Sequence, residues 1–156
     1  EGLPGSFWRQ LHRCGFYSRP SARGYSKRRY TYYQPNDKDL KDNYGDCAIR
    51  TICKAENLSW LDAYDMMYRL SREVQCPMNC KYGFEHILKS KGYVYTGISN
   101  KKGTKRPTVD SFTKEHLEGT YVLIVANHYV CSKDGHYFDT WDSGECSMYG
   151  YWVKEE

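Results

Sequence analysis

The chain has 156 residues and a formal net charge of +4, and 16% of its residues are aromatic. This length suits one domain, with a core large enough to fold without a metal or a disulfide framework. No apolar run approaches the length of a membrane span and no secretory signal is recognisable, so we expect no membrane partner.

The positive charge is concentrated at the N-terminus. Residues 1–33 carry seven Arg and Lys side chains against Glu1 alone, a net charge of +6, whereas the other 123 residues hold 16 basic and 18 acidic side chains. The segment has no sustained helix or strand period. We therefore predict an irregular, Tyr-rich arm over residues 1–35 and one folded domain over residues 36–156. The arm of residues 1–33 is expected to dock on a protein or on the domain itself, and a polyanion is the less favoured partner because Lys and Arg are not dense enough to require nucleic acid.

The cysteine count is odd, which argues against a secreted disulfide scaffold and favours a reducing, cytoplasmic setting or a free reactive thiol. The seven are Cys14, Cys47, Cys53, Cys76, Cys80, Cys131 and Cys146. The Cys76–Cys80 spacing is wider than a zinc knuckle and lacks a clear second pair, so we expect free thiols here. Neither a metal nor a cofactor is predicted.

Regular patterns begin next to Asp46. Residues 47–55 predict an amphipathic helix, with Asp46 as a favoured N-cap and Gly45 permitting a sharp turn into it. Three further helices are predicted, one from Trp60 behind an N-cap Ser59, one over 84–90 and one over 109–116.

Most predicted strands lie in the last third of the chain. The predicted strands cover residues 93–96, 121–125, 128–132, 136–141 and 149–153, and all but the first lie in this part of the chain. Asp134-Gly135 stands between two of them and is a strong signal for a two-residue hairpin turn. Helices followed by antiparallel strands predict an α+β fold.

Cys47 is the candidate nucleophile. The thiolate is the reactive form of cysteine, and the partial positive charge of a helix N-terminus lowers the pKa of a thiol. Cys47 is predicted to stand at such a terminus. The alternative is a small buried hydrophobic residue, which is the commoner fate of a free cysteine.

His128 is the candidate general base, because it opens a predicted strand directly after an apolar strand and is therefore rigidly held. His136, in the turn region, is the competing candidate. A two-residue turn pairs Lys133 with His136 and puts Asp139, not Asp142, on the face of His128. We expect Asp139 to orient the imidazole, and Asp142 to replace it only if a bulge shifts the register by one residue.

Residues 43–50, Asn-Tyr-Gly-Asp-Cys-Ala-Ile-Arg, followed by a helix, by His128 and by an Asp that ends the next strand, resemble the papain-like cysteine peptidase superfamily. The strand portion is similar to the bacteriocin-processing peptidases, and the Cys segment to the ovarian-tumour-type deubiquitinases. Small uncharacterised proteins of bacteria and their phages also share the Gly-Asp-Cys turn and segments like residues 137–142 and 149–152. The resemblance covers about residues 36–153.

The resemblance implies a helical part, with the cysteine at a helix N-terminus, packed on a C-terminal antiparallel sheet. It implies a thiol-dependent hydrolase of peptide or isopeptide bonds, in which Cys47 attacks, His128 moves the proton and Asp139 orients the ring. Deamidation and transamidation use the same three groups and stay open. A phage origin would place the protein in the host cytoplasm or the virion.

One departure concerns the oxyanion hole. Many papain-like enzymes carry a Gln a few residues before the cysteine, but Gln34 is farther away, so we expect Asn43 and the backbone N–H of Cys47 to stabilise the oxyanion. Without such a donor the chain would be a weak or inactive papain-like module that binds a protein or nucleic acid through its basic arm.

Overall fold

The computed structural model describes residues 27–38 and 45–156, which form four helices and one six-stranded sheet. In chain order the elements are β1 (Tyr30–Tyr32), α2 (Cys47–Glu56), α3 (Trp60–Glu73), α4 (Lys81–Ser90), β2 (Tyr93–Gly97), α5 (Val109–Glu115), β3 (Thr120–Val125), β4 (His128–Lys133), β5 (His136–Asp139) and β6 (Gly150–Lys154). The predicted α+β class is confirmed. Among the described residues, none of the helices combines the length and apolar character that a bilayer span requires.

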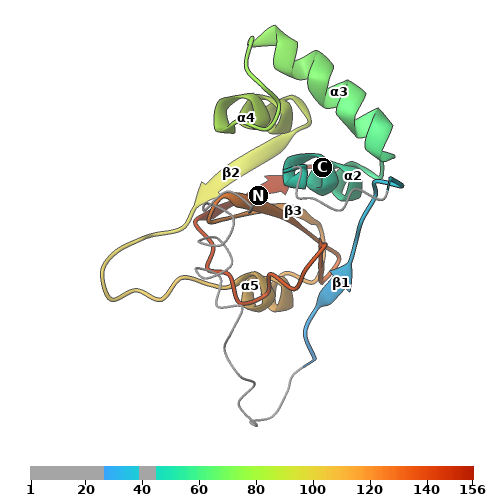
Figure 1. The fold of residues 1–156 in the computed structure, drawn as a ribbon. Coiled ribbons are helices and arrows are strands. Elements are labelled where there is room, and N and C mark those ends of the chain that lie inside the picture. Colours follow the sequence, from blue (N-terminus) through green and yellow to red (C-terminus); the bar gives the residue numbers. More distant parts are fainter. Residues whose placement is uncertain (1–26, 39–44) are drawn as a thin grey trace, which may run out of the picture.

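The strands follow the order β1-β5-β4-β3-β6-β2, and every neighbouring pair is antiparallel except the parallel pair β1 and β5. Figure 1 shows α2, α3 and α4 on one side of this sheet and α5 on the other. Because side chains alternate between the two faces of a strand, both faces of the central strands can be buried.

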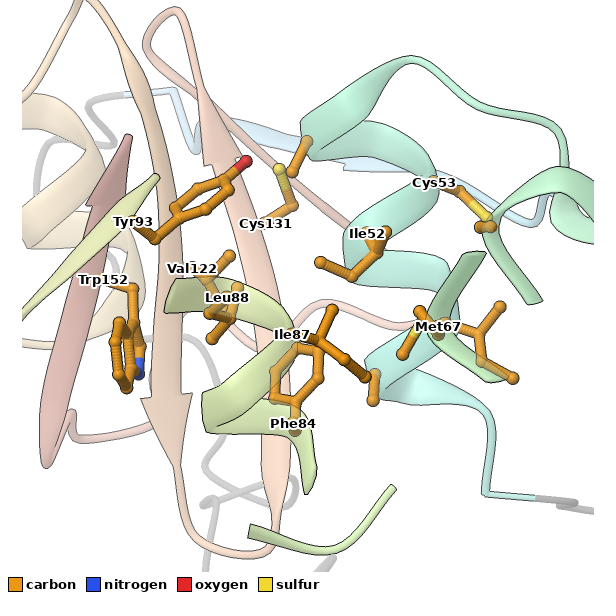
Figure 2. Packing of buried hydrophobic residues seen from close by; sticks show 14 residues of the cluster. Ile52, Cys53, Met67, Phe84, Ile87, Leu88, Tyr93, Val122, Cys131 and Trp152 are labelled. Atoms are coloured by element: carbon orange, nitrogen blue, oxygen red, sulfur yellow. The ribbon is translucent and has the colours of Figure 1, made fainter. Parts of the chain in front are cut away.

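Two apolar clusters fill the two sides of the sheet. Val122 and Cys131 face the cluster under α2, α3 and α4, whereas their neighbours Leu123 and Val130 face the cluster under α5. Figure 2 shows the first cluster, in which Leu88 of α4 meets the strands. The sheet is therefore the middle layer of the molecule.

The hairpin of β4 and β5 has the predicted geometry. Asp134 and Gly135 both have positive φ angles, 49° and 75°, as a two-residue turn of the hairpin type requires. Lys133 pairs with His136, so the predicted register is confirmed. The strand predicted over 136–141 ends earlier, at Asp139.

Residues 27–33, which the sequence predicts to be irregular, are attached to the domain. Tyr30–Tyr32 pair in parallel with β5 and form the last strand of the sheet. Arg28 is 2.8 Å from a carboxylate oxygen of Asp142 and 2.7 Å from one of Glu145. A three-residue strand is too short to show a period, which explains why the pattern missed it. Residues 1–26 lie outside the described residues.

Cys76 and Cys80 are joined by a disulfide across the loop between α3 and α4, with their Cα atoms 7.1 Å apart. The expectation that both are free thiols is wrong, because this loop brings the two side chains together. Of the cysteines outside this disulfide in the described part of the chain, Cys47 is partly exposed, whereas Cys53, Cys131 and Cys146 are buried.

A substitution at Phe84 tests how α4 packs on the sheet. Its side chain is fully buried, and its ring centroid lies 4.4 Å from that of Tyr129. We expect Phe84→Ala to lower the free energy of unfolding by about 3–5 kcal/mol, because it removes apolar contacts and leaves a cavity. Tyr82→Ala is the control on the same helix: its side chain is 63% exposed, and the change should stay within about 0.5 kcal/mol. Urea unfolding measures both, and equal effects would contradict this packing.

Candidate active site

Cys47 is the first residue of α2, so its backbone N–H lies ahead of the hydrogen bonds within the helix. Gly45, two residues earlier, has a φ angle of +65°, a left-handed conformation that favours glycine. The turn therefore delivers the chain sharply into the helix and leaves Cys47 at the positive end of the helix dipole.

Asp46 has a different role from the predicted one. It occupies the N-cap position of α2, but its side chain makes no capping hydrogen bond. One carboxylate oxygen accepts a hydrogen bond of 3.0 Å from the indole N–H of Trp60, and the other pairs with Arg50. A second guanidinium nitrogen of Arg50 lies 3.7 Å from Asp139. Arg50 therefore links the start of the cysteine helix to the end of β5.

His128 and Asp139 are in direct contact. Nε2 of His128 is 2.7 Å from Oδ2 of Asp139, and both side chains are buried. The carboxylate is itself held, because it accepts hydrogen bonds of 2.8 Å from the hydroxyl of Ser143 and from the backbone N–H of Thr140. The predicted contact of Asp139 with His128 is confirmed.

The two rejected alternatives lie elsewhere. Asp142 accepts a hydrogen bond of 2.6 Å from the hydroxyl of Tyr137 and pairs with Arg28. His136 is exposed at the start of β5. The hairpin register places Asp139 on the face of His128, and Asp142 lies beyond the end of β5.

The thiol of Cys47 meets the imidazole of His128. Burial by itself raises the pKa of Cys47, but the hydrogen bond and charge of His128, the backbone N–H of Tyr129 and the charge of Arg50 outweigh it, and the pKa is lowered from 9.0. Burial lowers the pKa of His128, yet its hydrogen bonds and charge attraction to Asp139 and Cys47 raise it above 6.5. Both shifts favour a thiolate beside an imidazolium.

Trp141 covers the imidazole. Its ring lies 5.3 Å from that of His128, centroid to centroid, at an angle of 28°. An aromatic wall of this kind limits the orientations of the imidazole and keeps water from one of its faces. The structure thus holds His128 by a carboxylate at one ring nitrogen and by an indole at one face.

The predicted oxyanion donors are described only in part. The backbone N–H of Cys47 is at the helix start, but Asn43 lies outside the described residues. Gln34 is far from Cys47 in sequence, but it directly follows Tyr33. The backbone N–H of Tyr33 donates a hydrogen bond of 2.8 Å to the carbonyl of Asp139. The pairing of β1 with β5 therefore places Gln34 near Asp139, the last residue of β5.

The roles of three residues of the site were missed by sequence reasoning. Arg50 stands three residues after Cys47 on the same helix, which was a usable signal for a nearby charge. The hairpin register predicts that Trp141 faces His128 but does not indicate its role there, and nothing in the sequence singles out Ser143. In the described ranges, no group of three or more His, Cys, Asp or Glu side chains is arranged to hold a metal ion.

Cys47 should react with iodoacetamide at mildly acidic pH, because its pKa is lowered and an ordinary thiol is almost fully protonated there. His128→Ala should slow this labelling at least about tenfold by removing the hydrogen bond and the charge. Cys53 and Cys131 serve as internal controls in the mass spectrum, since burial raises the pKa of each to about 12. Labelling of Cys47 with the pH dependence of an ordinary thiol would contradict the ion pair.

Comparisons with known proteins return no match: no family model, no curated protein and no solved structure is similar to this chain. The function is therefore inferred from the site and from the sequence motifs around it.

Proposed function

We propose that this chain is a thiol-dependent hydrolase with a papain-like fold that cleaves a peptide or isopeptide bond. The observation that carries the proposal is the continuous contact from Cys47, at a helix N-terminus, through His128 to Asp139. A nucleophile, a base and a group that orients the base are the three parts that covalent catalysis of acyl transfer requires.

In the first half of the reaction the Cys47 thiolate attacks the carbonyl carbon of the scissile bond. The C–N bond then breaks as the imidazolium of His128 gives its proton to the departing amine, which leaves a thioester on Cys47. Asp139 keeps the ring in place, since it holds Nε2 and so leaves Nδ1 for the thiol. The lowered pKa of Cys47 and the raised pKa of His128 provide the thiolate and the acid at the same pH.

In the second half a water molecule attacks the thioester. His128 accepts a proton from this water as its oxygen bonds to the acyl carbon, and the C–S bond then breaks. The acyl group leaves as a carboxylic acid, and the thiolate returns to its pairing with the imidazolium. Turnover should decline as the pH rises through the raised pKa of His128, because the acid for the leaving amine is then lost. It should also decline as the pH falls through the lowered pKa of Cys47, because the thiolate is then protonated.

The two Asp residues provide a matched test of this mechanism. Asp139→Asn should lower kcat/KM for labelled casein and for peptide aminocoumarin amides by about 100-fold, because the amide no longer stabilises the imidazolium. Asp142→Asn should leave kcat/KM within about threefold, since Asp142 contacts Tyr137 and Arg28 instead of His128. Circular dichroism checks that both variants are folded at the assay temperature. Equal losses would remove Asp139 from the proposed role.

The oxyanion donor is tested by a pair of amide variants. We expect Asn43→Ala to lower kcat by about 100- to 1000-fold and Gln34→Ala to lower it by much less, with iodoacetamide labelling of Cys47 unchanged in both. The reverse ranking would assign the donor to Gln34, which β1 brings beside the end of β5. Loss of labelling in either variant would instead show damage to the ion pair.

A further inference from the structure

A groove lies beside the nucleophile, between α3, the first turn of α2 and the loop that joins α3 to α4. It encloses about 600 Å³ and is walled by Gly45, Asp46 and Ile49 on the α2 side. Sites for ligands and peptide segments in proteins have volumes of this order. Figure 1 shows α3 as the outer helix of its layer, so this side of α3 is not covered by the sheet.

The α3 wall is a row of aromatic side chains four residues apart, Trp60, Tyr64 and Tyr68, here called the aromatic ladder. The ring centroids of Trp60 and Tyr64 are 5.2 Å apart with 17° between the planes, and those of Tyr64 and Tyr68 are 6.5 Å apart with 5° between the planes. Tyr64 is 38% and Tyr68 is 51% exposed. The ladder thus begins at Trp60, which packs against the core cluster, and continues outward as an ordered aromatic surface through Tyr64 and Tyr68.

The geometry of the ladder favours an extended peptide over a nucleic acid. The rings are stacked on one another along the row, which leaves fewer ring faces for stacking on bases. In an extended chain, side chains on one face recur about every 6.6 Å, which is close to the ring spacing. Within the described residues neither tyrosine hydroxyl has a hydrogen-bond partner, so both are available to peptide carbonyls.

Arg72 adds a charge at the end of the ladder. Its guanidinium lies 5.8 Å from the ring centroid of Tyr68 and also lines the groove. None of the acidic side chains in the described ranges pairs with Arg72. A carboxylate is the ligand group that complements a guanidinium, through two parallel hydrogen bonds.

We propose that this groove binds the substrate polypeptide next to its scissile bond, as an extended segment with apolar side chains at alternate positions and a carboxylate that reaches Arg72. Gly45 and Asp46 wall the groove, and Cys47 is the next residue, one Cα step of about 3.8 Å away. The groove therefore reaches to within one residue of the nucleophile, although Cys47 itself does not line it. The inference rests on the proposed function for its substrate, but binding can be measured without catalysis.

The test uses the full chain with Cys47→Ala and two fluorescein-labelled peptides of alternating Leu and Thr, with Glu at the N-terminal end in one and at the C-terminal end in the other. We expect one of them to bind, as measured by fluorescence anisotropy. Tyr68→Ala should raise its Kd about tenfold. Tyr82→Ala on α4, outside the groove and 63% exposed, is the matched control and should leave Kd unchanged.

The acidic end of the peptide is tested against Arg72. Replacing Glu by Gln in the peptide should raise Kd about fivefold, and Arg72→Gln should abolish this difference. Arg69→Gln, on the same helix but outside the groove wall, should preserve it. If Arg69→Gln also abolishes the difference in Kd between the Glu and the Gln peptide, the effect is one of general charge and the role of Arg72 is overturned.

The outcomes separate this inference from the proposed function. If Cys47 is reactive but neither peptide binds, or if Tyr68→Ala leaves Kd unchanged, the groove does not hold the substrate and the hydrolase proposal stands. If the peptides bind as expected but Cys47 fails the labelling test, the groove is a peptide site and the hydrolase proposal falls. Self-association in sedimentation velocity that Tyr68→Ala abolishes would assign the groove to a second copy and overturn the inference.

Discussion

The two-residue turn at Asp134-Gly135 is the constraint on which the site depends. Positive φ angles at both turn residues make the hairpin close with Lys133 opposite His136. A slip of one residue would reverse every side chain of β5 and carry Asp139 away from His128. The candidate base and its orienting group are therefore set by backbone geometry several residues away from either of them.

The cysteine helix is locked to the same hairpin at both of its ends. Near its start, the partly buried guanidinium of Arg50 bridges Asp46 and Asp139, and at its far end the ammonium of Lys133 lies 3.2 Å from the carbonyl of Ala55. A buried ion network adds little net stability because of the desolvation cost, but removing one member leaves an unpaired charge. We infer that this network maintains the approach of Cys47 to His128.

The candidate catalytic groups and the proposed peptide groove are built from different layers of the fold, which meet at the start of α2. The sheet is buried on both faces, and β4 and β5 bring His128 and Asp139 to the N-terminus of α2. The outer helix α3 packs Ala63 and Met67 inward and leaves Tyr64 and Tyr68 partly exposed. One amphipathic helix thus contributes to the core with one stripe and to the groove with another.

The sequence by itself determined the α+β class, the position of Cys47 at a helix start, the hairpin register and hence the pairing of His128 with Asp139. These follow from local rules, namely helix period, turn chemistry and strand alternation, which act within a few residues. Only the tertiary structure decided the parallel strand β1, the Arg50 bridge and the disulfide between Cys76 and Cys80. The strand and the bridge depend on distant segments meeting in space, and local patterns carry no information about which distant groups a buried charge or an open sheet edge will find. The disulfide joins cysteines only four residues apart, and it depends on the conformation of the loop between α3 and α4, which the spacing of the two cysteines did not reveal.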